Sequence, residues 1–133
     1  MPIAPVYCGT DPSPQELESL RKFVKAQKTL VVISSDFCHY GQRFDYNPQF
    51  KGKTAQETVD ALNMAAVEAI KRSPEAFREN LEETENTICG RHSIFTGLKL
   101  FDAYQAELVS YTSSGALRDR YDSSVSYCGI VGK

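Results

Sequence analysis

The sequence lacks any block of like charge, any long apolar run and any signal-peptide pattern. Its 17 acidic and 15 basic residues nearly balance, so we expect neither nucleic acid nor an anionic membrane as a partner. The longest apolar run, residues 30–33, is far too short to cross a bilayer. Residues 1–5 carry neither the basic nor the apolar region of a signal peptide. We therefore expect a soluble, cytoplasmic protein with one domain, because 133 residues are too few for two independent cores.

Several common site motifs are also missing. The chain has no G-x-G-x-x-G, Walker loop, H-E-x-x-H or G-x-S-x-G pattern. The serine pairs at 34–35 and 123–124 are not set in a nucleophile elbow, so we reject a serine nucleophile. The four cysteines form no C-x-x-C pair, which favours free thiols over a disulfide framework. Two of them, Cys8 and Cys128, lie in apolar segments and are predicted to be small buried hydrophobic residues.

The pattern of apolar and capping residues predicts strands that alternate with groups of helices. Ser13 and Thr54, each with a glutamate three residues later, predict capping boxes at two helix starts. Residues 29–33 are β-branched and apolar throughout, as expected for a strand covered on both faces. The fold class is therefore predicted to be α/β, a mixed β-sheet with packed helices. We expect strands at 3–8, 29–33, 108–112 and 124–131, helices at 14–28, 54–72, from 74 and after 92, a loop at 42–53 and a turn at 113–115.

Two short segments, residues 34–41 and 87–92, hold both histidines and two of the cysteines. In the first segment, Asp36 and His39 stand three residues apart at the end of a predicted strand. The carboxylate could orient the imidazole, or the pair could hold a metal ion. Alternatively, Asp36 caps a turn and His39 bonds to the backbone. Such a concentration of reactive groups is typical of a metal-binding or catalytic pocket.

In the second segment, Cys89 and His92 are also three residues apart, at the predicted amino end of a helix. A helix amino terminus favours a thiolate, so Cys89 is the candidate for a cysteine of low pKa. Thiolate and imidazole suit zinc, copper or iron, and Arg91 could bind a carboxylate or phosphate. The alternative is that Cys89 is buried against the sheet and Arg91 forms a surface salt bridge.

The same segments resemble the Memo family, whose members are similar in fold to the class III extradiol dioxygenases. The matching stretches are residues 32–44, 86–92 and 122–127, and the resemblance extends from about Ile3 to Gly132. It corresponds to the carboxyl-terminal half of a Memo protein. It therefore implies a single Memo-like domain over residues 1–133, with the fold of that half.

The resemblance also implies roles for individual residues. Cys89 falls at the family's metal-ligating cysteine, His39 at the acid/base histidine of the related dioxygenases, and Asp36 in the same pocket. His39 and Asp36 are thus the catalytic candidates, and Arg91 and His92 complete the expected binding pocket. The implied cofactor is iron or copper. The implied biology is redox and cell-motility signalling, with phosphotyrosine peptides or signalling proteins as partners.

The amino-terminal half of the family supplies two further metal-binding histidines, from H-A-G-Y-like and S-H-H motifs that this sequence does not contain. Three hypotheses follow: a non-enzymatic binding or signalling module, a metal-dependent oxidoreductase completed by histidines from elsewhere, or a structural remnant. Alone, the chain is expected to hold a metal weakly or not at all. Half a sheet leaves an unpaired edge, which predicts self-association.

Overall fold

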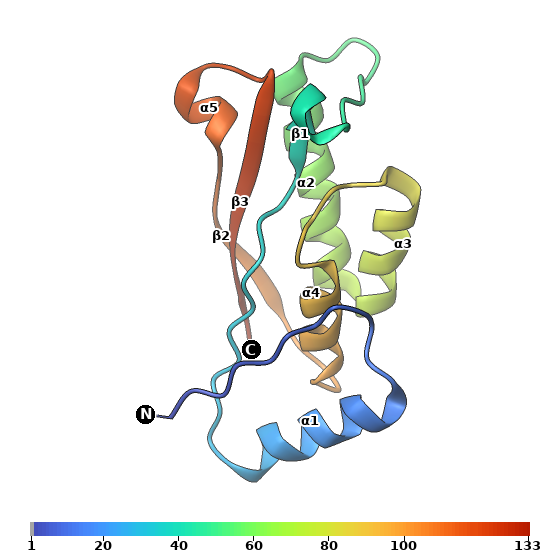
Figure 1. Cartoon of the computed structure of the whole chain (residues 1–133), viewed down its shortest axis with the longest axis vertical. Coiled ribbons are helices and arrows are strands. Elements are labelled where there is room, and N and C mark those ends of the chain that lie inside the picture. The colour runs from blue at the N-terminus through green and yellow to red at the C-terminus, as the bar shows by residue number, and fades with distance from the viewer. Residues whose placement is uncertain (1) are drawn as a thin grey trace.

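The computed structural model describes residues 2–133, and within them helices pack against an antiparallel three-stranded sheet (Figure 1). The predicted α/β class is confirmed. No helix in this described part of the chain combines the length and the apolar character that crossing a membrane requires. In chain order the elements are α1 (Pro14–Ala26), β1 (His39–Gly41), the 3-10 helix η1 (Gln42–Phe44), α2 (Ala55–Arg72), α3 (Pro74–Thr84), α4 (Arg91–Lys99), β2 (Ala106–Ser113), α5 (Ser114–Arg118) and β3 (Ser123–Gly132).

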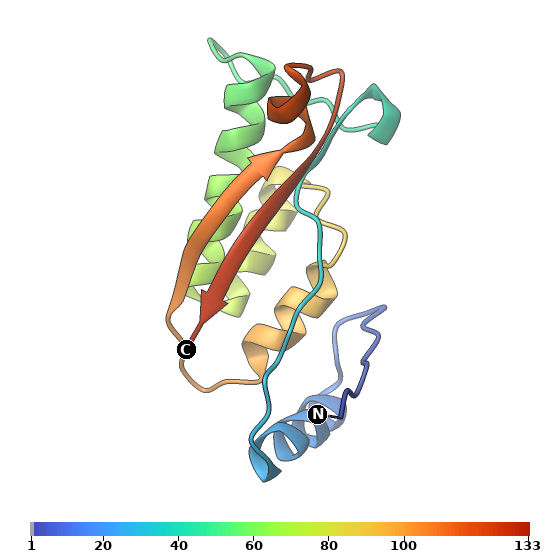
Figure 2. The same ribbon diagram turned by 90° about the vertical axis from the view of Figure 1, so that its left-hand side faces the viewer.

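The sheet has the order β1-β3-β2, so β3 is its central strand. Strand β2 pairs with β3 from Ala106 opposite Gly132 to Ser113 opposite Ser126, with an irregularity near Val109. Strand β1 is much shorter and pairs only with the first residues of β3. Helices α2 and α3 lie behind β2 and β3 in Figure 2 and cover one face of this hairpin, whereas the short α5 lies at its upper end.

The two capping boxes are confirmed. Ser13 accepts the backbone N–H of Glu16, whose carboxylate accepts the N–H of Ser13, and Thr54 and Glu57 repeat the arrangement. Each exchange satisfies backbone donors that a helix start otherwise leaves unpaired. Helix α1 is then attached to the end of α4 through Arg21, which donates to the carbonyl of Lys99 at 2.6 and 2.9 Å.

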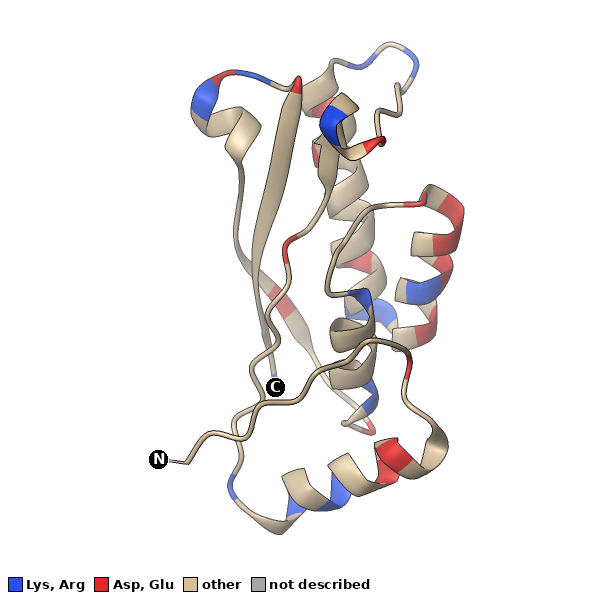
Figure 3. Cartoon of the chain, in the orientation of Figure 1, with Lys and Arg blue, Asp and Glu red and all other residues tan. Residues whose placement is uncertain are grey.

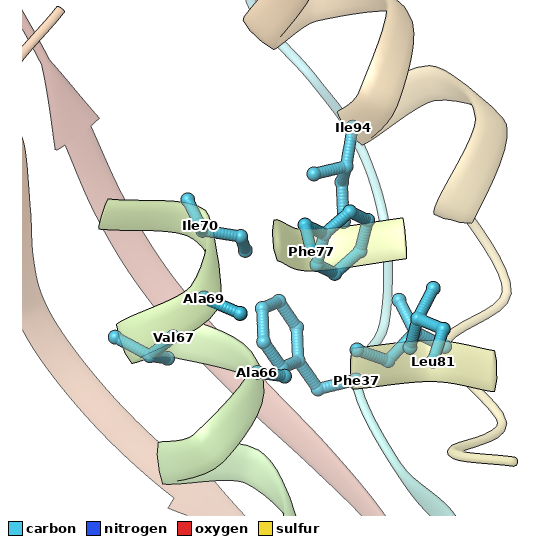
Figure 4. Packing of buried hydrophobic residues seen from close by; sticks show 9 residues of the cluster. Phe37, Ala66, Val67, Ala69, Ile70, Phe77, Leu81 and Ile94 are labelled. Carbon is cyan, nitrogen blue, oxygen red and sulfur yellow. The ribbon is translucent and has the colours of Figure 1, made fainter. Parts of the chain in front are cut away.

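The core lies between the sheet and α2, α3 and α4. Phe37 projects from the segment before β1 into a cluster with Ala66, Phe77 and Leu81 (Figure 4). A second cluster joins Cys38 and Tyr40 to the other end of α2. Phe37 and Cys38 are therefore each buried in a different core cluster. Their burial fixes the backbone at this point and so positions the neighbouring polar residues Asp36 and His39.

The predicted strands at residues 3–8 and 29–33 are wrong, because neither segment forms a ladder within residues 2–133. Val32 is 80% exposed, the opposite of the burial on both faces that its composition suggested. A β-branched segment is regular only where a neighbouring strand supplies hydrogen-bond partners, and none is paired with it here.

The predicted turn at 113–115 is also wrong, because α5 begins there. The hydroxyl of Ser113 accepts the N–H of Ala116 and caps this short helix. The predicted burial of two thiols has a mixed outcome. Cys128 packs at the edge of the core, whereas Cys8 is half-buried in the irregular amino-terminal segment.

Candidate metal-binding site

Asp36, His39 and Cys89 come together where the segment before β1 meets the loop before α4. One ligand atom from each, a carboxylate oxygen, an imidazole nitrogen and a thiol sulfur, all lie within 4.8 Å of one another. His39 Nε2 and Asp36 Oδ2 are 3.9 Å apart. The two sequence clusters, more than 40 residues apart in the chain, thus form one site.

His39 is held by Thr87. The Thr87 hydroxyl accepts the backbone N–H of His39 and donates to its carbonyl, each at 2.8 Å. The carbonyl oxygen of Thr87 lies 2.9 Å from His39 Nδ1. Because a carbonyl can only accept, this contact places the proton on Nδ1 and leaves the Nε2 lone pair free. A metal-binding histidine is commonly oriented in this way by a partner of its second nitrogen.

Cys89 is positioned by the approach of its loop to Ser35. The Ser35 hydroxyl accepts the N–H of Gly90 at 2.9 Å and donates to the carbonyl of Asp36 at 2.7 Å. A Cβ on Gly90 would lie 2.5 Å from the Ser35 side chain, so only glycine permits this approach. Cys89 Sγ then lies 3.9 Å from the Ser35 hydroxyl.

Cys89 directly precedes Gly90, the N-cap of α4, as the sequence predicted. It is exposed, so the alternative that it is buried against the sheet is wrong. The other three thiols lie elsewhere, and burial raises the pKa of both Cys38 and Cys128 to about 12. Among the four cysteines of residues 2–133, Cys89 is therefore the one whose thiol faces solvent beside an imidazole and a carboxylate.

The three donors fit a transition-metal ion. Metal–ligand bonds of about 2.1 Å in a tetrahedral site place ligand atoms about 3.4 Å apart, so a small inward movement would bring all three into contact with one ion. The side chain of Asp36 is 50% exposed and Cys89 faces solvent. Further coordination positions would therefore be open to water or to a ligand.

The structure does not bring His92 and Arg91 into contact with this group. His92 Nδ1 lies 2.8 Å from Asp11 Oδ1, and Asp11 also pairs with Arg78 at 2.6 Å. Arg91 and His92 line a separate hollow of about 300 Å³ between α3 and α4. The expected five-residue pocket thus divides into two neighbouring groups.

Asp11 is the acidic centre of that second group. Its partial burial acts to raise the pKa of its carboxyl, but the hydrogen bonds and positive charges of His92 and Arg78 outweigh burial and hold the pKa below its usual range. The Arg78 guanidinium also lies 3.9 Å above the ring of Phe95. Asp11 thereby joins the amino-terminal segment to α3 and α4.

Sequence reasoning missed three positioning residues. Thr87 and Ser35 stand inside the two polar clusters, so the density of polar groups there was the available signal. Asp11 gave no signal, because 81 positions separate it from His92.

Comparisons with known proteins place the chain in one family. A family model described as Memo-like protein matches residues 2–131. The Protein memo-1 homolog of Caenorhabditis elegans is 32% identical over 145 residues, which are 97% of this chain and 41% of that protein. Protein MEMO1 of Homo sapiens is 34% identical over 139 residues, covering 94% of this chain and 46% of the relative. For Protein MEMO1 of Xenopus tropicalis the identity is 35%, with the same two shares. The chain spans less than half the length of these curated relatives.

Proposed function

Because this chain belongs to the Memo-like family, we propose that it is a binding module in which Asp36, His39 and Cys89 hold one iron or copper ion. The observation that carries the proposal is the convergence of their three ligand atoms within 4.8 Å. A carboxylate, an imidazole and a thiolate together form a donor set suited to these metals.

The surroundings of the three ligands favour binding over a purely structural role. His39 Nδ1 is occupied by the carbonyl of Thr87, which aims Nε2 at the site. The exposed faces of Asp36 and Cys89 leave room for an additional ligand. A structural metal site would instead be closed by four protein ligands.

Metal analysis of the purified chain tests the proposal. The chain is incubated with Fe(II) or Cu(II), desalted, and analysed by inductively coupled plasma mass spectrometry. The sequence alone predicted weak binding, but the carboxylate of Asp36 adds a third ligand beside Cys89 and His39. We therefore expect close to one ion per chain, lost in Cys89→Ala and in His39→Ala. The matched control is Cys8→Ala, which removes a half-buried thiol from another part of the surface and should retain the ion. Protein that stays metal-free with both ions would overturn the proposal.

A phosphotyrosine-bearing peptide is the ligand class that we propose for this module, in a cytoplasmic role in motility signalling. The support is the exposed side chain of Arg91, which lines the neighbouring hollow between α3 and α4, since arginine binds phosphate through paired hydrogen bonds. Fluorescence anisotropy with a labelled phosphotyrosine peptide and its unphosphorylated twin tests this. Binding should require the phosphate and weaken about tenfold or more in Arg91→Ala. Equal binding of the two peptides would exclude phosphate recognition.

A second candidate function is a metal-dependent oxidoreductase related to the class III extradiol dioxygenases. It is favoured by the open side of the site and by His39, whose free Nε2 faces the carboxylate of Asp36 at 3.9 Å. This function would need two further histidines, from an amino-terminal half like that of the relatives or from a partner chain. Oxygen uptake by the metal-loaded chain with a catechol, measured with an oxygen electrode and abolished in His39→Ala, would support it. Absence of uptake by fully loaded protein would leave binding as the function of the chain alone.

A further inference from the structure

An apolar cleft of about 370 Å³ opens between β3 and the segment of residues 29–36, and it shares no lining residue with the hollow around Asp11. We call it the acceptor cleft. Helix α4 forms part of its floor, and Val31 and Ile33 face it from one wall while Cys128 and Ile130 face it from the other. In Figure 3 the strands and the wall segment beside it carry almost no charged residues. The cleft therefore favours an uncharged, apolar occupant.

Both walls of the acceptor cleft present unpaired backbone. On the side away from β2, the last hydrogen bonds of β3 are made by Ser126, which accepts from Phe37 and donates to Cys38. Alternation along a strand directs the backbone groups of Cys128 and Ile130 to this same edge. Within residues 2–133, no backbone hydrogen bond is made on this edge of β3 beyond Ser126, nor by residues 30–34 of the opposite wall.

These unpaired donors and acceptors favour a strand over a small apolar molecule as the occupant. A peptide strand brings its own N–H and C=O groups to both walls and apolar side chains to the floor. Proteins recognise extended peptides at free sheet edges by this strand addition. A simple hydrocarbon would leave the wall groups desolvated and unpaired, at a cost in free energy.

Residues 3–8 of this chain have the chemistry that the cleft requires. The sequence predicts a strand there, yet the structure leaves the segment irregular, with Ile3 87% and Tyr7 95% exposed. The six residues 3–8 span about 20 Å when extended, at about 3.3 Å per residue. The free edge of β3, residues 127–132, has the same number of residues.

We propose that residues 3–8 of one copy of this chain insert as a strand into the acceptor cleft of a second copy, between β3 and residues 29–36. Insertion in trans is favoured because a chain's own segment lies on the far side of residues 29–36 from β3 (Figure 2). Asp11 also holds that segment against Arg78 and His92.

The alternation of the inserted strand accommodates its proline. If Ala4, Val6 and Cys8 direct their backbone groups to β3, all three can both donate and accept there. Pro5, which has no N–H, then faces the opposite wall. Because residues 29–36 are irregular there, fewer backbone hydrogen bonds would be formed on that side. The proposal thus names Val6 as the central pairing residue of the β3 edge.

Multi-angle light scattering of the full chain over a roughly 100-fold concentration range tests the association. We expect oligomers that form with increasing concentration and that dissociate when a blocked synthetic peptide of residues 2–9 is added. Val6→Pro removes the central N–H and should weaken association about tenfold or more, which corresponds to about 1.4 kcal/mol. Val6→Ala keeps the backbone donor and is the matched control. Val6 is 60% exposed, so neither change should unfold the monomer, and circular dichroism verifies this.

Two results would overturn the proposal. Association that Val6→Pro leaves unchanged would place the contact on another surface. A chain that stays monomeric over the whole range, with no binding of the peptide, would exclude insertion of residues 3–8 into the cleft.

Discussion

Thr87 binds His39 through three contacts at once. Its hydroxyl accepts the histidine N–H and donates to the histidine carbonyl, both at 2.8 Å, and its carbonyl lies 2.9 Å from Nδ1. A single residue thus fixes both the backbone and the ring of His39. The tautomer and direction of the imidazole are consequently set by the loop that also carries Cys89.

Replacing the Thr87 hydroxyl should weaken metal binding without removing any ligand. Thr87→Val keeps the side-chain shape but leaves the backbone N–H and C=O of His39 without this partner. We expect the metal Kd to rise about 10–100-fold. We also expect the free energy of unfolding to fall by about 1–3 kcal/mol. Isothermal titration calorimetry and urea unfolding measure the two effects.

Thr96→Val is the matched control for this change. The Thr96 hydroxyl is buried in α4 and has no hydrogen-bond partner within residues 2–133, so the substitution breaks no bond. Stability should be unchanged or slightly higher, and metal affinity unchanged. Equal losses in both variants would contradict a specific role for Thr87.

Cys89 should be the fastest thiol to react with iodoacetamide. Alkylation requires an accessible thiolate, and burial raises the pKa of Cys38 and of Cys128 to about 12, so both remain protonated at neutral pH. Cys89 is exposed, whereas Cys8 is half-buried. Peptide mapping after brief labelling measures the order, and Cys89→Ser should remove the fast phase. Earlier modification of Cys8 or Cys128 would contradict the prediction.

The helices were the most predictable part of the fold, because their signals are local. Ser13 and Thr54 form the capping boxes that their spacing predicted, since both partners lie within one turn. Residues 29–33 have equally strong β-forming composition but no ladder, because a strand depends on a partner distant in sequence. The composition of a segment shows that it can form a strand, but it does not show whether a second strand lies beside it.

The site was predictable to the extent that its residues cluster in the chain. Asp36, His39 and Cys89 meet as expected, since two polar segments beside buried residues converge. His92 has the same three-residue spacing from Cys89 that His39 has from Asp36, yet it turns to Asp11. The spacing of two residues determines the relative direction of their side chains, but the residue that each side chain contacts depends on the surrounding elements.

Asn63, which no sequence pattern distinguished, should be among the most sensitive positions for stability. Its side chain is fully buried in α2, accepts the N–H of Cys38 at 3.1 Å, and donates to Tyr111 and Ser126 at 3.1 and 2.8 Å. Asn63→Leu leaves several buried polar groups unpaired, so we expect a loss of at least about 2 kcal/mol in urea unfolding.

The control for Asn63 is the same substitution at Asn80 in α3. The Asn80 side-chain oxygen is buried without a hydrogen-bond partner in residues 2–133, so Asn80→Leu should cost at most about 0.5 kcal/mol. If Asn63→Leu were equally mild, the network joining α2 to the sheet would not contribute to stability.

The ion pairs of Asp11 with Arg78 and His92, which we call the Asp11 tether, should make stability depend on pH in the acid range. His92 and Arg78 hold the folded-state pKa of this carboxyl below its ordinary value of 3.8 despite partial burial. A lowered folded pKa means that the stabilisation is complete above the unfolded pKa and is lost as pH falls through the folded one. Asp11→Asn should therefore lower the melting temperature slightly near neutral pH and have no effect at about pH 2.

Asp119→Asn removes the same charge from an exposed loop position where asparagine also tolerates the left-handed backbone, and serves as the control. A difference between Asp11→Asn and the unmodified chain that persists at the acid limit would contradict the ionic tether.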